Sequence, residues 1–235
     1  MSLLTLEGVH TYYGEAHILQ GVSATVGEGE VVTLIGRNGA GKTTTLRSIM
    51  GIVRARQGHV RLRGEDITAL KTHEIARRGI AWIPEERRVL PNLTVLENLR
   101  LGMLGGTAPN GADVLEEVFG YFPRLRERIA HRGRFLSGGE QQMLAIARGL
   151  VSRPTVMLVD EPTEGLAPLL VQNLTEILAA INRRGTTILL VEQTLEVALA
   201  LSHRVYVMDQ GQIQFEGTPE QLRRDPTIQQ RVLEI

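Results

Sequence analysis

Short runs of aliphatic and β-branched residues alternate along this chain with segments whose apolar positions repeat every three to four residues. The apolar runs predict four core strands, at residues 31–35, 155–160, 186–192 and 204–208. Because nearly every position in these runs is apolar, we expect strands buried on both faces, as in a parallel sheet. Their alternation with helical segments predicts an α/β fold with crossover helices.

The first third of the chain has a different pattern. Residues 3–9, 22–26 and 59–62 form short, turn-bounded segments in which apolar and polar positions partly alternate. Such alternation is typical of antiparallel strands with one solvated face. We therefore expect an N-terminal antiparallel β layer beside a mostly parallel core sheet.

The middle of the chain has a helical pattern. It predicts helices at 95–103 and 114–122, separated by a Gly- and Pro-rich loop at 105–111, and a third helix that starts at Ser137. Near the C-terminus, the capping box at 218–221 and Asp225 before a proline predict two short closing helices.

These patterns suggest one domain over residues 1–235. We expect residues 85–153 to form a helical subdomain, inserted between the α/β segments 1–84 and 154–235. A chain of 235 residues with 43% hydrophobic content can bury the core of such a domain.

Composition narrows the function. Lys+Arg 26 and Asp+Glu 26 leave no formal net charge, so we expect no nucleic-acid partner. The absence of cysteine excludes disulfides and thiol chemistry. The first residues lack the basic segment of a signal peptide, and no apolar run approaches the roughly 20 residues that span a bilayer. We therefore expect a cytoplasmic protein whose role at a membrane, if it has one, depends on a partner.

A glycine-rich loop follows the first predicted core strand. It reads Gly36-Arg37-Asn38-Gly39-Ala40-Gly41-Lys42-Thr43, with Thr44 next, and matches the phosphate-binding pattern G-x-x-x-x-G-K-[ST] between a strand and a helix. In this pattern the backbone amides surround phosphates, the lysine reaches their oxygens and the threonine hydroxyl can bind Mg²⁺. The chain has only two lysines, and Lys42 is one of them. An ordinary glycine turn is the alternative interpretation.

An acidic pair, Asp160-Glu161, ends the second predicted core strand. At the carboxyl end of a parallel strand such groups face the ligand crevice. Asp160 suits a Mg²⁺ ion, and Glu161 can polarise an attacking water. The alternative is a simple helix cap after a strand.

The segment Leu136-Ser137-Gly138-Gly139-Glu140 opens the third predicted helix. Ser137 with Glu140 three residues later forms a capping box, which alone indicates only a helix start. Two glycines in the first turn cost helix stability, about 1 kcal/mol each relative to alanine. They indicate close approach of another group, and a glycine-rich helix start with a hydroxyl can bind an anion.

The glycine-rich loop, the LSGGE segment and the Asp-Glu pair, in this order, resemble the ATP-binding subunits of ABC transporters over essentially the whole chain. The resemblance implies a P-loop NTPase (RecA-like) fold that binds ATP and Mg²⁺. It also implies that Ser137, Gly138, Gly139 and Glu140 complete the ATP site of a second cassette in a dimer. Tyr13 would stack on adenine, although a core tyrosine is the alternative.

Three positions depart from the common pattern of that family. Glu85 stands where a glutamine contacts Mg²⁺ and the membrane partner, Gln193 where a histidine contacts the γ-phosphate, and Ala167 where an aspartate is usual. Glu85 is thus a candidate metal ligand, while Glu161, Gln193 and Lys42 are the candidate catalytic residues. The departures resemble the second, LivF-type ATPase subunit of branched-chain amino-acid importers.

The resemblance also implies partners. These are a second ABC ATPase subunit in a homodimer or heterodimer, integral membrane permease subunits at the inner face of the cell membrane and, indirectly, a solute-binding protein. The alternatives are a lipid-export or urea-type ABC system, a soluble ABC ATPase without a transport role, and a nucleotide-gated module without turnover.

Overall fold

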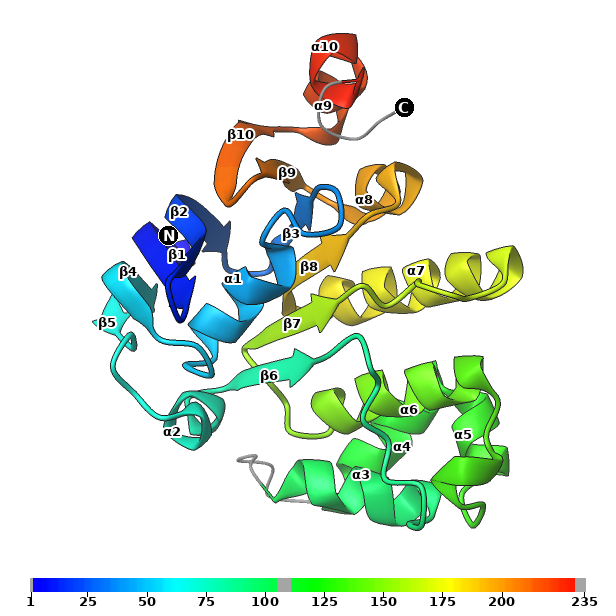
Figure 1. The fold of residues 1–235 in the computed structure, drawn as a ribbon. Coiled ribbons are helices and arrows are strands. Elements are labelled where there is room, and N and C mark those ends of the chain that lie inside the picture. The colour runs from blue at the N-terminus through cyan, green and yellow to red at the C-terminus, as the bar shows by residue number, and fades with distance from the viewer. Residues whose placement is uncertain (1, 105–110, 231–235) are drawn as a thin grey trace.

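The structure, a computed structural model, describes residues 2–104 and 111–230, which form two β-sheets with helices around them (Figure 1). The larger sheet has the strand order β10-β9-β3-β8-β7-β6, and the smaller one the order β2-β1-β4-β5. The predicted α/β fold with a mostly parallel core sheet and an antiparallel layer is therefore confirmed.

All four predicted core strands are present. They are β3 (Val31–Ile35), β7 (Val156–Asp160), β8 (Thr187–Glu192) and β9 (Arg204–Asp209). They pair in parallel, and β3 lies between β8 and β9. The structure adds two edge strands that were not predicted, β6 (Ile80–Ile83) and β10 (Gln212–Gly217). The first has only four residues, and the second is half exposed and antiparallel to β9.

The antiparallel layer is longer than predicted. It consists of β1 (Ser2–Tyr13), β2 (Ala16–Gly27), β4 (Ala55–Leu62) and β5 (Glu65–Asp66). Register shifts divide the β1–β2 pair into shorter regular stretches, and for this reason the sequence pattern covers only parts of each strand. Helix α1 (Lys42–Ile49) lies between this layer and the core sheet (Figure 1).

Residues along the core strands alternate between two hydrophobic cores. Leu158 and Leu189 pack with α1 and the antiparallel layer. Met157 and Ile188 pack on the opposite face, against helices from the middle of the chain. Burial of both faces explains why these strands are continuously apolar.

The middle of the chain folds into helices below the core sheet in Figure 1. They are α3 (Val95–Met103), α4 (Gly111–Tyr121), α5 (Pro123–Glu127), the 3₁₀ turn Gly133–Phe135 and α6 (Gly138–Leu150). The predicted helix at 114–122 thus begins three residues earlier. Of the predicted loop at 105–111, residues 105–110 lie outside the described residues, and Gly111 is helical. The division of the chain at 84/85 and 153/154 stays a prediction.

The remaining helices complete the crossovers and the C-terminal end. They are α2 (Thr72–Arg77), α7 (Pro168–Arg183), α8 (Leu195–Leu201), α9 (Pro219–Arg223) and α10 (Pro226–Ile228). The two predicted closing helices are confirmed, since the Thr218 hydroxyl accepts from the Gln221 amide and the Asp225 carboxylate from the Ile228 amide. In the described part of the chain, no helix combines the length and the hydrophobicity that a membrane crossing requires.

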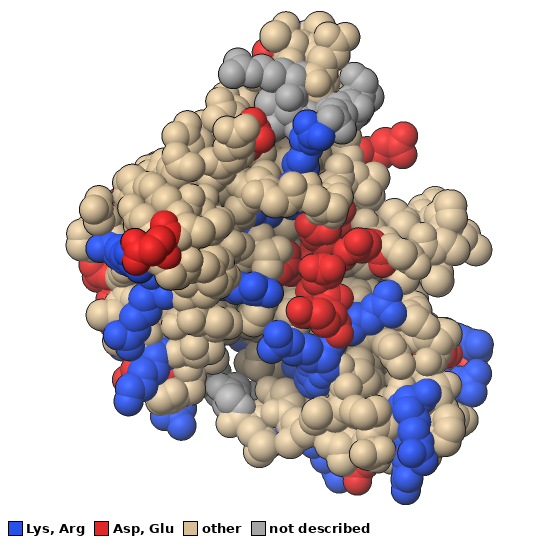
Figure 2. Space-filling model, viewed as in Figure 1, with Lys and Arg blue, Asp and Glu red and all other residues tan. Residues whose placement is uncertain are grey.

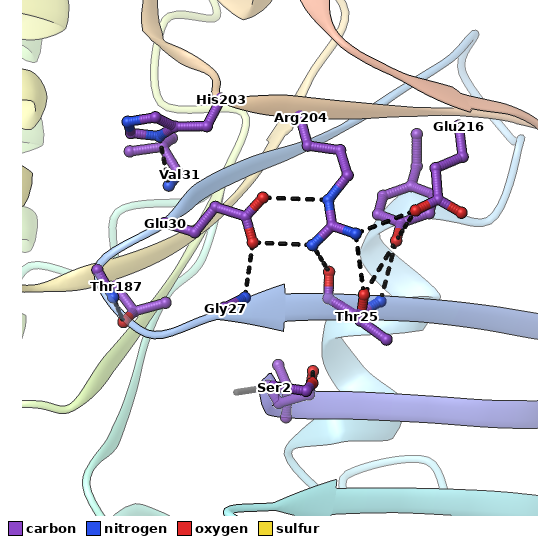
Figure 3. Close-up of polar contacts among 12 residues, drawn as sticks. Ser2, Thr25, Gly27, Glu30, Val31, Thr187, His203, Arg204 and Glu216 are labelled. Atoms are coloured by element: carbon purple, nitrogen blue, oxygen red, sulfur yellow. Dashed lines mark hydrogen bonds and ion pairs between the residues drawn. The ribbon is translucent and has the colours of Figure 1, made fainter.

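One arginine ties the two sheets together (Figure 3). Arg204 on β9 donates to both oxygens of Glu30, at 3.1 and 2.8 Å, and to Glu216 on β10, at 3.0 Å. It also reaches the Thr25 hydroxyl and carbonyl on β2. Because the network joins β2, β9 and β10, it fixes the antiparallel layer against the core sheet, on which the candidate site depends.

Candidate functional site

The glycine-rich loop lies between β3 and α1, where the carboxyl end of a central strand meets a helix start. Gly41 has φ 106°, in the left-handed region that favours glycine. A Cβ on Gly36 would lie 2.2 Å from the Met208 carbonyl oxygen. The β9 backbone therefore allows only glycine at position 36, and Gly41 allows the left-handed turn at the start of α1.

A cavity of about 460 Å³ opens above this loop. Its lining includes nine of the predicted site residues: Tyr13, Asn38, Gly39, Gly41, Lys42, Thr43, Thr44, Glu85 and Glu161. Gly36 and Ala40 belong to the loop itself and do not line the cavity. The sequence analysis missed Ile18 and Glu164, which also line it. Ile18 reaches the cavity through the β1–β2 hairpin, a pairing that no local motif indicates.

Tyr13 lies at the rim of the cavity and is 41% exposed, which excludes the alternative of a core tyrosine. Its hydroxyl accepts from Arg47 of α1 at 3.3 Å. Tyr12 is engaged elsewhere, stacked on His17 at 4.1 Å between ring centroids and covered by Arg56. Of the two tyrosines, Tyr13 is the one with an accessible face beside the loop.

Lys42 is buried and contacts the loop that carries it. Its ammonium donates to the carbonyl oxygens of Gly36 at 2.7 Å and Arg37 at 3.0 Å. It also forms an ion pair with Glu161, with 3.2 Å between Nζ and Oε1. The side chains of Lys42 and Glu161 are 3% and 8% exposed, so the pair is shielded from water.

Glu161 is held at both ends. Its amide donates to the Val191 carbonyl of β8 at 2.9 Å, and its φ of 43° is unusual for a residue with a side chain. Its second carboxylate oxygen accepts from Gln193 Nε2. The resemblance predicts that Gln193 contacts a phosphate. In the structure it contacts Glu161, the carboxylate that the sequence predicts to be catalytic.

Asp160 lies deeper, at the end of β7. Its Oδ1 accepts from the Thr43 hydroxyl at 3.1 Å, while its Oδ2 is buried with no hydrogen-bond partner among the described residues. Burial raises the pKa of Asp160 to about 7, the Thr43 hydroxyl opposes this rise, and Glu161 and Glu85 add to it. A buried carboxylate with an unpaired oxygen next to a threonine hydroxyl fits a divalent cation.

Glu85 lines the same cavity as the loop. Burial raises its pKa, and hydrogen bonding to Glu164 with charge repulsion from Glu164, Glu161 and Glu86 raises it further. Figure 2 shows acidic side chains gathered at the centre of this face, with basic side chains around them. A cation would relieve this repulsion, which supports Glu85 as a group near a metal.

A further buried carboxylate was missed by the sequence analysis. Glu192 ends β8, is 2% exposed and accepts from the Thr163 hydroxyl at 2.8 Å. Burial raises its pKa, while the contacts with Thr163 and with the amides of Thr194 and Gln193 oppose the rise. Glu192 therefore ties the segment after Glu161 to the start of the Gln193 loop.

The capping box at the start of α6 has the predicted geometry. The Ser137 hydroxyl accepts from the Glu140 amide at 3.3 Å, and the Glu140 carboxylate accepts from the Ser137 amide at 2.9 Å. Burial alone would raise the pKa of Glu140, but the Ser137 amide and hydroxyl lower it overall. The described residues that line the cavity do not include Ser137, Gly138, Gly139 or Glu140. The chain folds without bringing these four residues to its own glycine-rich loop.

Helix α6 is nevertheless linked to the Glu85 loop. Arg148 donates to the carbonyl oxygens of Arg88 at 2.8 Å and Arg87 at 3.3 Å, and Arg87 Nε donates to Gln142 at 3.1 Å. Arg87 and Arg88 have φ values of 60° and 46°. The helix thus holds this loop in an uncommon backbone conformation.

We expect Asp160→Asn to stabilise the ligand-free protein at pH 8. The folded pKa of Asp160, about 7, lies above the ordinary 3.8, so the native state prefers the protonated form. The protonated form of Asp160 stabilises the native state fully below about pH 4. This stabilisation is lost as the pH rises through 7, which lowers the free energy of unfolding by at most about 4 kcal/mol. Urea unfolding in EDTA should show a gain for the variant that is roughly 1 kcal/mol larger at pH 8 than at pH 6. Equal stability of the two proteins at both pH values would contradict this account of Asp160.

Comparison with known proteins finds relatives that align over nearly the whole chain. The sequence model of a family described as ABC transporter matches residues 19–164. The high-affinity branched-chain amino acid transport ATP-binding protein BraG of Pseudomonas aeruginosa is 43% identical, over 98% of this chain and 99% of that protein. The lipopolysaccharide export system ATP-binding protein LptB of Haemophilus influenzae is 36% identical, over 97% of this chain and 95% of that protein. The dimeric structure of MJ0796, a bacterial ABC transporter cassette, has a TM-score of 0.82 and 27% identity, over 92% of this chain and 98% of that one.

Proposed function

The chain belongs to the ABC transporter family of ATP-binding proteins, and we propose that it hydrolyses ATP to power an importer for branched-chain or related amino acids. The similarity to BraG over nearly the whole chain supports the solute class. The positions Glu85, Ala167 and Gln193, which resemble the LivF-type subunit, agree with this solute class. The 36% identity to a lipopolysaccharide export protein makes a lipid-export system the main competitor.

One observation carries the catalytic part of the proposal. Lys42, Thr43, Asp160 and Glu161 meet in or beside a single cavity, although more than 100 residues separate the two pairs. Lys42 and the loop amides would bind the phosphates of ATP, and Glu161 would orient the attacking water. Tyr13 would pack against the adenine from the rim.

Thr43, Asp160 and Glu85 would hold Mg²⁺, which when bound neutralises charge on the transferring phosphate. Among the described residues, no group of three or more His, Cys, Asp or Glu could hold a metal alone. Mg²⁺ commonly binds through one or two carboxylates together with substrate phosphates. Asp160 Oδ2, which has no hydrogen-bond partner among the described residues, agrees with a metal site that is shared between the protein and the phosphates.

The unit that we propose as active is a dimer. The start of α6, formed by Ser137, Gly138 and Gly139, lies outside the cavity of its own chain. A glycine-rich helix start with a hydroxyl can bind an anion. In a head-to-tail pair it would bind the γ-phosphate of the other chain's ATP. The partner is a second copy or a related ATPase subunit.

The permease subunits would dock on a second cavity of about 460 Å³, between β6 and helices α3 and α6. Its lining includes Trp82, Arg87, Leu101 and Arg148, and Leu101 is 41% exposed. Arg148 holds the loop that also carries Glu85, so this surface is linked to the nucleotide cavity. We propose that the chain is bound there at the cytoplasmic face of the cell membrane.

Capture of the tagged chain from native membranes tests the solute class. We expect permease subunits and a second ATPase subunit to co-purify. After reconstitution with a solute-binding protein, leucine, isoleucine or valine should stimulate ATP hydrolysis. Capture of lipid-export subunits, or stimulation by urea alone, would instead assign the chain to one of the alternative systems.

A further inference from the structure

The guanidinium of Arg87 lies against the start of α6. A Cβ on Gly138 would lie 2.9 Å from Arg87 Nη1 and 3.9 Å from its Nη2, so a larger residue at position 138 would displace the guanidinium. Arg87 Nε donates to the side chain of Gln142, one turn further along the helix, at 3.1 Å. These two contacts place the guanidinium along the first turn of α6.

The charge of Arg87 has no carboxylate partner among the described residues. The one hydrogen bond that its side chain makes there is the Nε bond to Gln142, which is neutral. The neighbouring Arg88 differs, because it pairs with Glu86 at 3.6 Å and lies over the Trp82 ring at 5.6 Å from its centroid. Arg87 is partly exposed, so Nη1 and Nη2 can donate to an anion.

The backbone that carries Arg87 is held in an uncommon conformation. Its φ of 60° lies in the left-handed region, which is unfavourable for a residue with a side chain. The Arg87 amide donates to the Pro84 carbonyl at 3.0 Å, and the Arg87 carbonyl accepts from Arg148 of α6 at 3.3 Å. Such conformations cluster at ligand-binding sites, because the surrounding structure must enforce them. The fold therefore fixes this side chain beside Gly138.

We propose that Arg87 binds the γ-phosphate of the partner chain's ATP, together with the backbone amides at the start of α6. The inference rests on the proposed dimer, in which this helix start faces the nucleotide of the other chain. A guanidinium can donate two parallel hydrogen bonds to a phosphate, and the helix dipole adds charge of the same sign. Arg87 does not line the cavity of its own chain, so it serves only the partner's ATP.

Arg87→Gln should lower the turnover of the isolated chain by about 10- to 100-fold, because hydrogen bonds from a charged group to the phosphate are lost. Its affinity for ADP, measured by calorimetry, should change by less than about twofold, since Arg87 lies outside the cavity. Arg88→Gln is the matched control. It removes the same charge from the same left-handed backbone, but this charge already pairs with Glu86, so turnover should stay within about twofold of the wild type.

Mixtures of variants identify the ATP site that Arg87 serves. Lys42→Ala disables the cavity of its own chain, and Ser137→Asp disables the helix start that serves the partner. If Arg87 acts on the partner's ATP, half of the dimers in a mixture of Arg87→Gln and Lys42→Ala contain one intact site. This mixture should recover roughly a quarter of wild-type turnover. Arg87→Gln mixed with Ser137→Asp should recover nothing, because both changes damage the same half of each site.

The reverse pattern, recovery with Ser137→Asp and none with Lys42→Ala, would mean that Arg87 acts through the Glu85 loop on its own chain's cavity, and would overturn the proposal. Recovery with both variants, or unchanged turnover of Arg87→Gln alone, would also overturn it. These mixtures contain no permease, so docking at the second cavity, which Arg87 also lines, cannot produce the expected pattern. The proposed dimer fails separately, if Lys42→Ala and Ser137→Asp do not restore each other.

Discussion

Glu161→Gln should lower the rate of ATP hydrolysis by about 10²- to 10⁴-fold, which corresponds to roughly 3 to 5 kcal/mol of barrier. The physical reason is that a carboxylate polarises the attacking water through its negative charge, and the neutral amide of glutamine lacks this charge. The side chain keeps its size, and the backbone contact of residue 161 with Val191 does not involve the carboxylate. Binding of ATP is therefore retained, and the variant should accumulate as an ATP-bound dimer.

Phosphate release and size-exclusion chromatography with ATP measure both effects. Glu164→Gln serves as the control, because this acid lines the same cavity and carries no assigned role in orienting water. It should retain most of the wild-type turnover. Turnover of Glu161→Gln at the wild-type rate would remove Glu161 from the mechanism, and loss of ATP binding would indicate a structural role.

Ser137→Asp should separate the two functions of the helix start at α6. Aspartate caps helices as well as serine does, so the free energy of unfolding should change by less than about 0.5 kcal/mol. A carboxylate at the point where a partner's γ-phosphate is expected repels that phosphate. We therefore expect turnover to fall by at least about 100-fold, equivalent to roughly 3 kcal/mol of barrier.

Ser137→Ala is the complementary variant. It removes the hydroxyl that accepts from the Glu140 amide, which should cost about 0.5–2 kcal/mol of stability. It adds no charge, so its turnover should fall less than that of Ser137→Asp. Urea unfolding and phosphate release give the two quantities. If Ser137→Asp hydrolyses ATP normally, the segment is only a helix cap.

Local patterns were enough to predict the elements that carry the site. The continuous apolar strands β3, β7, β8 and β9 are buried on both faces, and burial of this kind leaves an unambiguous sequence signal. The glycine-rich loop and the capping box at Ser137 are also local, because each depends on residues within one turn. These elements were predicted correctly for this reason.

Contacts between distant segments could not be predicted. Gln193 was expected at a phosphate and is bonded to Glu161, from which 32 positions separate it. Glu192 looked like the end of an apolar strand, and its bond to Thr163 depends on how two loops pack. The edge strand β6 has four residues, too few for a periodic pattern. In each case the information lies in the packing and not in the local sequence.

Mixing two inactive variants tests the central claim that each ATP site is built from two chains. Lys42→Ala removes the phosphate-binding lysine, and Ser137→Asp blocks the helix start that serves the partner. If the sites are shared, half of the randomly paired dimers contain one intact site. The mixture should then recover roughly a quarter of wild-type hydrolysis, while each variant alone stays inactive. A mixture that remains as inactive as its components would contradict the shared site and with it the proposed dimer.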